Sequence, residues 1–137
     1  MKEDLPINIV EDISIAIILE AATPEAKVWN VYLINEKPIA IQHVLVSSKG
    51  YGIHNGIQVK TSTLRHFFEE VNPNSFLKIE AIDPQVFGLT SEYWLSFYVD
   101  GIMYDKKYVF LPESIIDDNL IKVPLVNKPG IMIGGVN

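Results

Sequence analysis

Apolar and polar residues alternate with a period of two along much of this chain, which is the spacing of a β-strand with one buried face. Residues 13–20 are the clearest case, because four apolar side chains fall on one side. Similar segments lie at 28–34, 39–46, 57–60, 76–82 and 120–126. The pattern predicts a mainly β chain of seven to eight short, mostly antiparallel strands, arranged as a sandwich or an open barrel.

Turn sequences separate these segments and indicate how they pair. Asn-Gly at 55–56 and Asp-Gly at 100–101 favour tight two-residue hairpin turns, because both residues tolerate positive φ. Residues 35–38 are also rich in turn formers. We therefore expect segments 28–34 and 39–46 to form a hairpin.

One segment has the period of a helix instead. Its apolar positions are Leu64, Phe67, Phe68 and Val71. They follow the i, i+3, i+4, i+7 spacing of one helical face. Residues 61–63 offer N-caps and the Asn-Pro-Asn sequence at 72–74 offers a stop. The pattern predicts one short amphipathic helix over residues 62–71.

The most aromatic part of the chain is the predicted hairpin over residues 93–110. One face carries Tyr93, Leu95, Phe97, Val99, Ile102, Tyr104, Tyr108 and Phe110. This face is predicted to lie in the core. Lys106 interrupts it, which we interpret as a bulge or as the exposed end of the strand.

The opposite face of this hairpin carries Trp94, Tyr98, Met103 and Lys107. Either a second layer buries this face or it is exposed, and the sequence leaves both open. Exposed Trp, Tyr and Met are enriched at protein interfaces, and aromatic side chains also stack on sugars and bases. Lys107 lies opposite Trp94 and is expected to make a cation–π contact with it.

Composition narrows the function classes. The 137 residues are 48% hydrophobic and 20% charged, which is typical of one folded domain spanning 1–137. The net charge is −6 and Arg65 is the only arginine, which argues against nucleic acid as a partner. The absence of cysteine excludes disulfides, thiolate catalysis and cysteine metal sites.

The N-terminal apolar run gives no reason to expect a membrane protein. Residues 13–19 are far shorter than the ~20 residues of a membrane helix. Acidic rather than basic residues precede the run, which is the wrong sign for a signal peptide. The sequence therefore predicts a soluble, cytoplasmic protein.

Candidate chemistry is sparse. His43, His54, His66 and Glu69 are the residues that an enzyme or a small-ligand or carbohydrate-binding barrel would place around a pocket. No metal is predicted, because a helical zinc motif needs two histidines at i and i+4. The glycines at 50–56 do not match a nucleotide-binding loop, so no cofactor is expected. No G-x-S-x-G nucleophile motif is present, and no catalytic residue is predicted.

Four stretches carry a family resemblance: residues 29–35, 60–70, 92–98 and 104–112. Over nearly its whole length the chain resembles a family of short uncharacterised bacterial proteins. Members of that family sometimes carry the label phenylalanyl-tRNA synthetase alpha subunit. The resemblance brings no catalytic residue with it and implies an accessory role beside translation.

Taken together, these observations favour a protein that works by binding rather than by catalysis. The predicted partner is another protein or a second copy of the chain. The predicted contact surface is Trp94, Tyr98, Met103 and Lys107.

Overall fold

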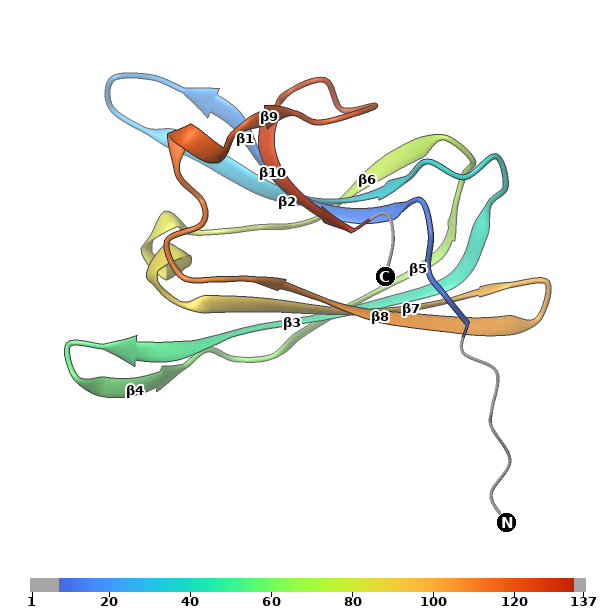
Figure 1. Cartoon of the computed structure of the whole chain (residues 1–137), viewed down its shortest axis with the longest axis horizontal. Helices are drawn as coiled ribbons and strands as arrows, with labels where there is room; N and C mark the ends of the chain where they lie inside the picture. Colours follow the sequence, from blue (N-terminus) through green and yellow to red (C-terminus); the bar gives the residue numbers. More distant parts are fainter. Residues whose placement is uncertain (1–7, 135–137) are drawn as a thin grey trace, which may run out of the picture.

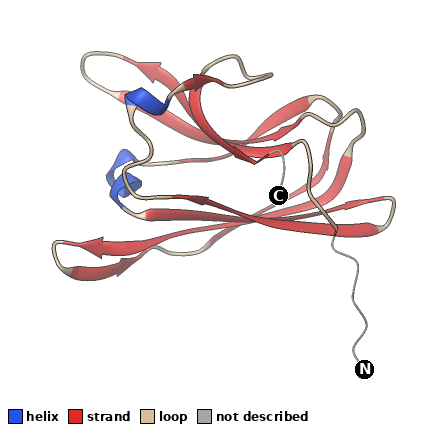
Figure 2. Cartoon of the chain, in the orientation of Figure 1, coloured by secondary structure: helices blue, strands red, loops and turns tan. Residues whose placement is uncertain are grey.

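The computed structural model describes residues 8–134, which form two antiparallel sheets packed face to face (Figures 1 and 2). Sheet A has the strand order β6 (Ser75–Ala81), β2 (Lys27–Asn35), β1 (Ile13–Ala22), β10 (Pro129–Gly134) and β9 (Ile121–Lys122). The mainly β prediction is confirmed, and of the two predicted architectures the sandwich is the one observed.

Sheet B is built on the longest strand. Its elements are β4 (Ile57–Lys60), β5 (Leu64–Val71), β3 (Ile41–His54), β7 (Thr90–Val99) and β8 (Ile102–Phe110). Strands β5 and β4 pair one after the other along one edge of β3, while β7 pairs along the other edge and β8 follows β7. Two 3₁₀ turns complete the described elements, η1 (Pro84–Gly88) and η2 (Asp117–Asn119).

The core lies between the sheets and follows the predicted period of two. The inward residues include Ile13, Ile15, Ile17, Trp29, Val31, Leu33, Val44, Val46, Tyr93, Leu95, Phe97, Tyr108 and Phe110. All of them are at most 6% exposed. Both tight turns form hairpins as predicted, β3–β4 at 55–56 and β7–β8 at 100–101, with all four turn residues at positive φ.

The predicted helix over residues 62–71 is wrong, because this segment is strand β5. It pairs with β3 from Ser48↔Leu64 to Ile41↔Val71, so its backbone satisfies one edge of the first half of β3. Phe68 and Val71 turn inward, whereas Phe67 is 58% exposed. A short apolar run fits either element, and the unpaired edge of β3 decides in favour of the strand.

The predicted hairpin between 28–34 and 39–46 is also wrong. Strand β2 pairs with β1 and β6, whereas β3 pairs with β4, β5 and β7. The turn after Asn35 therefore carries the chain from sheet A to sheet B. The Asn35 amide fixes this crossing, since Nδ2 donates to the carbonyl oxygens of Ile39 and Asn72, each at 3.0 Å, and Oδ1 accepts from the Lys37 N–H.

Lys106 marks neither a bulge nor a strand end. Strands β7 and β8 pair without a register shift, and Lys106 stays opposite Leu95 on the inner side of β8. Its ammonium lies 5.3 Å from the centre of the Tyr108 ring. Because β8 is an edge strand of sheet B, an inward-pointing lysine also discourages edge-to-edge pairing with other chains.

The outer face of sheet A is covered by the chain itself. Residues 123–128, here called the covering loop, connect β9 to β10. Val123 and Val126 of this loop pack with Ala16, Ile18 and Ile34 in a second apolar cluster. Only Ile121 and Lys122 of the predicted strand 120–126 are in a strand, because the rest of this segment covers the sheet instead of extending it.

Candidate functional site

The outer face of sheet B carries a group of exposed apolar and aromatic side chains, here called the open face. Its members are Phe67 on β5, His43 and Leu45 on β3, Trp94 and Tyr98 on β7, and Met103 on β8. The exposed fractions of its apolar members run from 36% for Tyr98 to 58% for Phe67. The aromatic hairpin thus has one buried and one exposed face, which decides between the two possibilities left by the sequence.

Ring contacts connect the members of the open face. The His43 ring lies between Phe67, stacked at a centroid distance of 6.5 Å, and Tyr98, edge-on at 5.9 Å. His43 has φ 49° and lies where the β3–β7 register shifts, so the irregularity places its ring on the outer side. Tyr98 is paired with Met103 across β7 and β8.

The predicted cation–π contact is present. The Lys107 ammonium lies 5.7 Å from the centre of the Trp94 ring, and the two residues are directly paired across β7 and β8. The contact holds the Trp94 side chain over the sheet while leaving it 46% exposed.

Charged residues of both signs flank the apolar members of the open face. On β5, Arg65 and Glu69 stand two residues before and two residues after Phe67, which places all three on the same side of the strand. Arg65 shares a row with Ser47, Trp94 and Lys107. Phe67 shares the next row with Leu45, Ser96 and Asp105. The face therefore has a basic row at one end and Glu69 at the other.

The structure distributes the predicted pocket residues over three places. His43 belongs to the open face, and Glu69 lies on the same side of the neighbouring strand β5. His54 lies at the end of β3 in the β3–β4 hairpin, which reaches past the end of the sandwich (Figure 1). His66 turns inward from β5 and binds Glu80 of sheet A. Within residues 8–134, no three His, Asp or Glu side chains are grouped so as to hold a metal ion.

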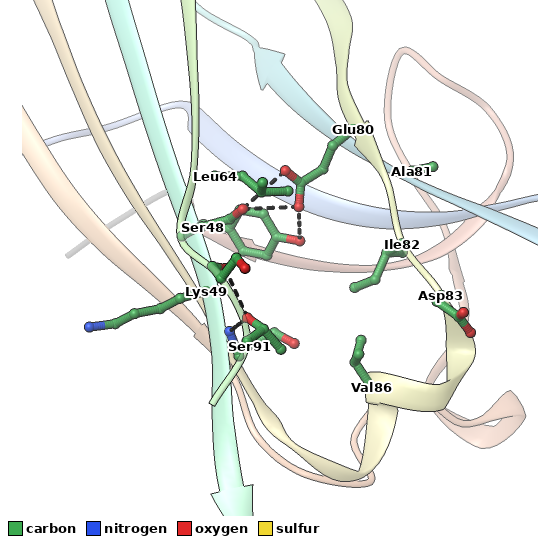
Figure 3. A pocket seen from close by; sticks show the side chains of 13 residues that line it. Ser48, Lys49, Leu64, Glu80, Ala81, Ile82, Asp83, Val86 and Ser91 are labelled. Carbon is green, nitrogen blue, oxygen red and sulfur yellow. Dashed lines mark hydrogen bonds between the residues drawn. The ribbon is translucent and has the colours of Figure 1, made fainter. Parts of the chain in front are cut away.

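A second site, the inter-sheet cleft, lies between residues of β6 in sheet A and residues of β3 and β7 in sheet B (Figure 3). It has a volume of ≈ 230 Å³. Small residues of β3 and β7 form its floor: Ser48, Gly50 and Ser91. The equivalent inward positions further along these strands carry larger side chains such as Val46 and Leu95, which fill the core. The cleft exists because the floor side chains are too small to fill the space between the sheets.

Glu80 is the charged residue at the polar end of this cleft. Its Oε1 accepts from Ser48 Oγ at 3.0 Å and from His66 Nε2 at 2.8 Å. Its Oε2 accepts from Tyr93 Oη at 3.1 Å and also lies 3.1 Å from Ser48 Oγ. The side chain is only 12% exposed. One carboxylate of sheet A is therefore held by three donors from three strands of sheet B.

Burial raises the pKa of the Tyr93 phenol, and the adjacent Glu80 carboxylate and their hydrogen bond raise it further. Tyr93 is thus a fixed donor to Glu80.

The order of Ser48, Glu80 and His66 along their hydrogen bonds excludes a serine-protease type of triad, in which histidine lies between the acid and the serine. Here Glu80 lies between His66 and Ser48, so His66 does not activate the Ser48 hydroxyl.

Sequence reasoning missed both Glu80 and the contribution of Phe67 and Leu45. A strict alternation along β6 places Glu80 with Phe76 and Lys78 on the outer side. A register shift between Val31 and Tyr32 in the β2–β6 pairing turns Glu80 inward instead. No sequence signal marks this bulge.

In the described part of the chain, no helix has the length and apolar character needed to span a membrane. Comparisons with protein-family models, with curated proteins and with solved structures give no match to this chain.

Proposed function

We propose that this protein is a non-catalytic self-association module that binds a second copy of itself through the open face. The observation that carries the proposal is the concentration of exposed aromatic and apolar side chains on one outer sheet face. Contiguous apolar surface of this kind marks interaction sites, and Trp and Tyr are the residue types most often found at the energetic centre of interfaces.

The charges on strand β5 favour a copy of the same chain as the partner. In a two-fold pair with its axis between the stacked faces and perpendicular to the strands, row order is reversed in the second copy. With the axis at the row of Phe67, this residue meets Phe67 of the other copy, and Arg65 meets Glu69. The face is therefore complementary in charge to itself along β5, as a symmetric interface requires.

The same reversal places large side chains against one another at the centre. Trp94 and Tyr98 stand two residues before and after Ser96 on β7, so each meets the other across the pair. Ser96 itself is small and leaves room for the facing rings. Leu45 lies beside Ser96 and meets its own copy.

The experiment is a measurement of mass in solution by multi-angle light scattering over a range of protein concentrations. The wild-type chain is expected to approach twice its 15.4 kDa mass as concentration rises. Trp94→Ala is expected to stay at 15.4 kDa, because it removes the largest side chain of the open face.

A matched control is Ile57→Ala. Ile57 is 67% exposed, but it lies on β4 in the projecting hairpin and outside the open face. This variant is expected to associate as the wild type does. A wild-type chain that keeps the monomer mass at every concentration would contradict the proposal, and so would a Trp94→Ala chain that associates normally.

Two further points stay predictions. The accessory role beside translation rests on the family resemblance alone. A cytoplasmic location rests on the sequence pattern at the N-terminal run.

A further inference from the structure

The inter-sheet cleft is a second feature of the molecule, separate from the open face. Residues 80–83 and Val86 lie on one side and residues 61, 62 and 64 on the other, with β3 and β7 as the floor (Figure 3). Leu64, Ile82 and Val86 give the walls an apolar character. At ≈ 230 Å³ the cleft is smaller than the roughly 300–1,000 Å³ of a drug-sized pocket, so it suits a small ligand.

Glu80 is the charged residue deepest in this cleft, and the protein itself engages it fully. Ser48 lies within hydrogen-bond distance of both carboxylate oxygens, His66 donates to Oε1 and Tyr93 donates to Oε2. His66 is also its ion-pair partner. Glu80 is therefore a structural link between the sheets and leaves no site for a ligand.

The other two charged lining residues are engaged as well. Asp83 Oδ1 accepts from the Gln85 N–H at 2.9 Å and so caps η1. The Lys49 ammonium points away from the cavity (Figure 3) and lies 3.8 Å from the Glu92 carboxylate. An ionic ligand would lose its hydration in the cleft without meeting a free charge among the described lining residues. The cleft therefore favours a neutral ligand.

The Ser91 hydroxyl is the polar group that sets this cleft apart. Ser91 lies on the inner side of β7 and is only 4% exposed. It lines the cleft, its Oγ is not fully enclosed, and its partner on β3 is Gly50, which has no side chain to cover it. Within residues 8–134, no group forms a hydrogen bond with this Oγ. Buried polar groups in folded proteins are almost always hydrogen-bonded, so the hydroxyl marks a position for the polar group of a ligand.

The remaining uncharged polar side chains of the cleft are occupied or lie outside its interior. Two of them donate to Glu80. Thr61 Oγ1 accepts from the Gly50 N–H at 2.7 Å and donates to the Ser62 carbonyl at 3.0 Å. The Ser62 side chain is exposed to solvent. Among the described lining residues, Ser91 is thus the buried hydrogen-bond donor that is left for a ligand.

We propose that the inter-sheet cleft binds a small neutral aliphatic carbonyl compound, a ketone or an ester. The Ser91 hydroxyl donates to the carbonyl oxygen, and the alkyl part lies between Leu64, Ile82 and Val86. A ketone or ester accepts this proton and brings no proton of its own that needs a buried acceptor. An alcohol brings a second O–H, and one of the two hydroxyl protons then stays unpaired, so the cleft prefers the carbonyl compound. This inference does not depend on self-association.

The experiment is a titration of the ¹⁵N-labelled chain followed by two-dimensional NMR, with 2-pentanone and 2-pentanol as the probes. The two probes share one carbon skeleton. 2-Pentanone is expected to shift the amide signals of Gly50, Ile82 and Ser91 in a saturable way. 2-Pentanol is expected to bind at least about tenfold more weakly, which corresponds to ~1.4 kcal/mol. Equal binding of the two probes, or no saturation with 2-pentanone, would overturn the proposal.

Two serine variants of β7 locate the site. Ser91→Ala removes the hydroxyl from the cleft and is expected to remove the preference for 2-pentanone. Ser96→Ala is the matched control, because Ser96 lies on the outer side of the same strand, and this variant is expected to bind both probes as the wild type does. A preference that survives Ser91→Ala, or that is lost in Ser96→Ala, places the ligand elsewhere and contradicts the proposal.

Thermal melting of Ser91→Ala tests whether the protein itself uses the hydroxyl. The melting temperature is expected to equal or exceed that of the wild type, because no hydrogen bond of the folded chain is lost. A lower melting temperature, or a variant that does not fold, would show that the hydroxyl has a partner within the protein and would contradict the proposal.

A charged probe tests the preference for a neutral ligand. Pentanoate has the same number of carbon atoms as 2-pentanone and carries a carboxylate. It is expected to bind at least about tenfold more weakly, because the cleft offers it no free cation. Pentanoate binding as tight as that of 2-pentanone would contradict the neutral class of ligand.

Discussion

The two outer faces of this sandwich differ in one respect that bears directly on function. On sheet A, Ala16, Ile18 and Ile34 point outward and are completely buried, because the covering loop packs over them. On sheet B, no loop among residues 8–134 covers the outward residues of the open face, and Phe67 and Trp94 keep about half of their surface exposed. The same chain buries one apolar outer face and leaves the other accessible.

The difference also shows in the residue types. The covered face has small and aliphatic side chains that suit close packing against Val123 and Val126. The open face has large rings flanked by Arg65, Glu69 and Lys107. This composition suits a surface that is exposed to solvent in the free chain and buried in a complex. The outer face of sheet A is covered by the chain itself. We propose that the outer face of sheet B is covered by a second copy of the chain.

The largest expected effect comes from matched truncations on the two faces. Ile18→Ala removes a fully buried side chain beneath the covering loop and should lower the free energy of unfolding by about 2–5 kcal/mol. Leu45→Ala removes a side chain that is 42% exposed and should cost the monomer about 0.5 kcal/mol or less. Urea denaturation at low protein concentration measures both, and equal losses would contradict the contrast between the faces.

A smaller loss of folding stability is expected at Gly130, where the covered face leaves no room for a side chain. A Cβ atom at Gly130 of β10 would lie 2.6 Å from the Ile17 carbonyl oxygen of β1. Because that neighbour is backbone, Gly130→Ala should destabilise the fold by about 1–3 kcal/mol. Gly88→Ala is the control, since its nearest contact would be an ordinary 3.5 Å to Glu113. Thermal melting that ranks the two alike would refute the close packing at Gly130.

Charge reversal on the open face should change association by a smaller amount. Arg65→Glu and Glu69→Arg each place like charges opposite one another in the proposed pair and should weaken association by about 0.2–1 kcal/mol per contact. The double variant restores opposite charges and should regain the wild-type dissociation constant. Sedimentation equilibrium measures these constants. A double variant weaker than either single one would rule out the two-fold arrangement.

The smallest expected effect is on the pH dependence of stability, through the carboxylate that holds the covering loop. Lys128 donates to Glu20 of β1, and Asn30 and Tyr32 also donate to this carboxylate. Partial burial alone raises the pKa of Glu20, but the hydrogen bonds from Lys128, Tyr32 and Asn30 outweigh it and lower the pKa below 4.5. The ionised form therefore stabilises the fold at neutral pH, and this contribution is lost as pH falls through the lowered pKa.

Thermal melting between pH 3 and pH 7 tests this contribution. Glu20→Gln should flatten part of the acid dependence of the melting temperature relative to wild type. Tyr32 gives the opposite sign at high pH, because burial and the adjacent Glu20 raise its pKa to about 12, so its contribution is lost as pH rises from 10 towards 12. An unchanged acid profile in Glu20→Gln would show that this cluster does not hold the loop.

Much of the fold is predictable from the sequence, and the failures have definite causes. The alternation over 13–20 and the dipeptides at 55–56 and 100–101 act locally, so they predict their strands and hairpins correctly. Residues 62–71 fail because pairing with β3 overrides a local helical pattern. The segment 120–126 fails because apolar residues that cover a sheet look the same as those that extend it.

The candidate sites divide in the same way. Trp94, Tyr98 and Met103 are found because strand alternation alone assigns them to one face. Phe67 and Leu45 join that face only through the pairing of β5 and β3. This pairing could not be predicted, because the apolar residues of β5 have the spacing of a helix in the sequence. Glu80 depends on a bulge set by the β2–β6 pairing, and so its inward position is a property of the assembled sheet.

The most direct test of the central claim is fluorescence quenching of Trp94 by acrylamide as protein concentration rises. The chain has two tryptophans, and Trp29 is only 6% exposed whereas Trp94 is 46% exposed. Quenching therefore reports mainly on the open face. We expect quenching to fall as the mass doubles, because Trp94 becomes buried between two copies. Quenching that stays constant while the mass doubles would show that the chain associates through another surface.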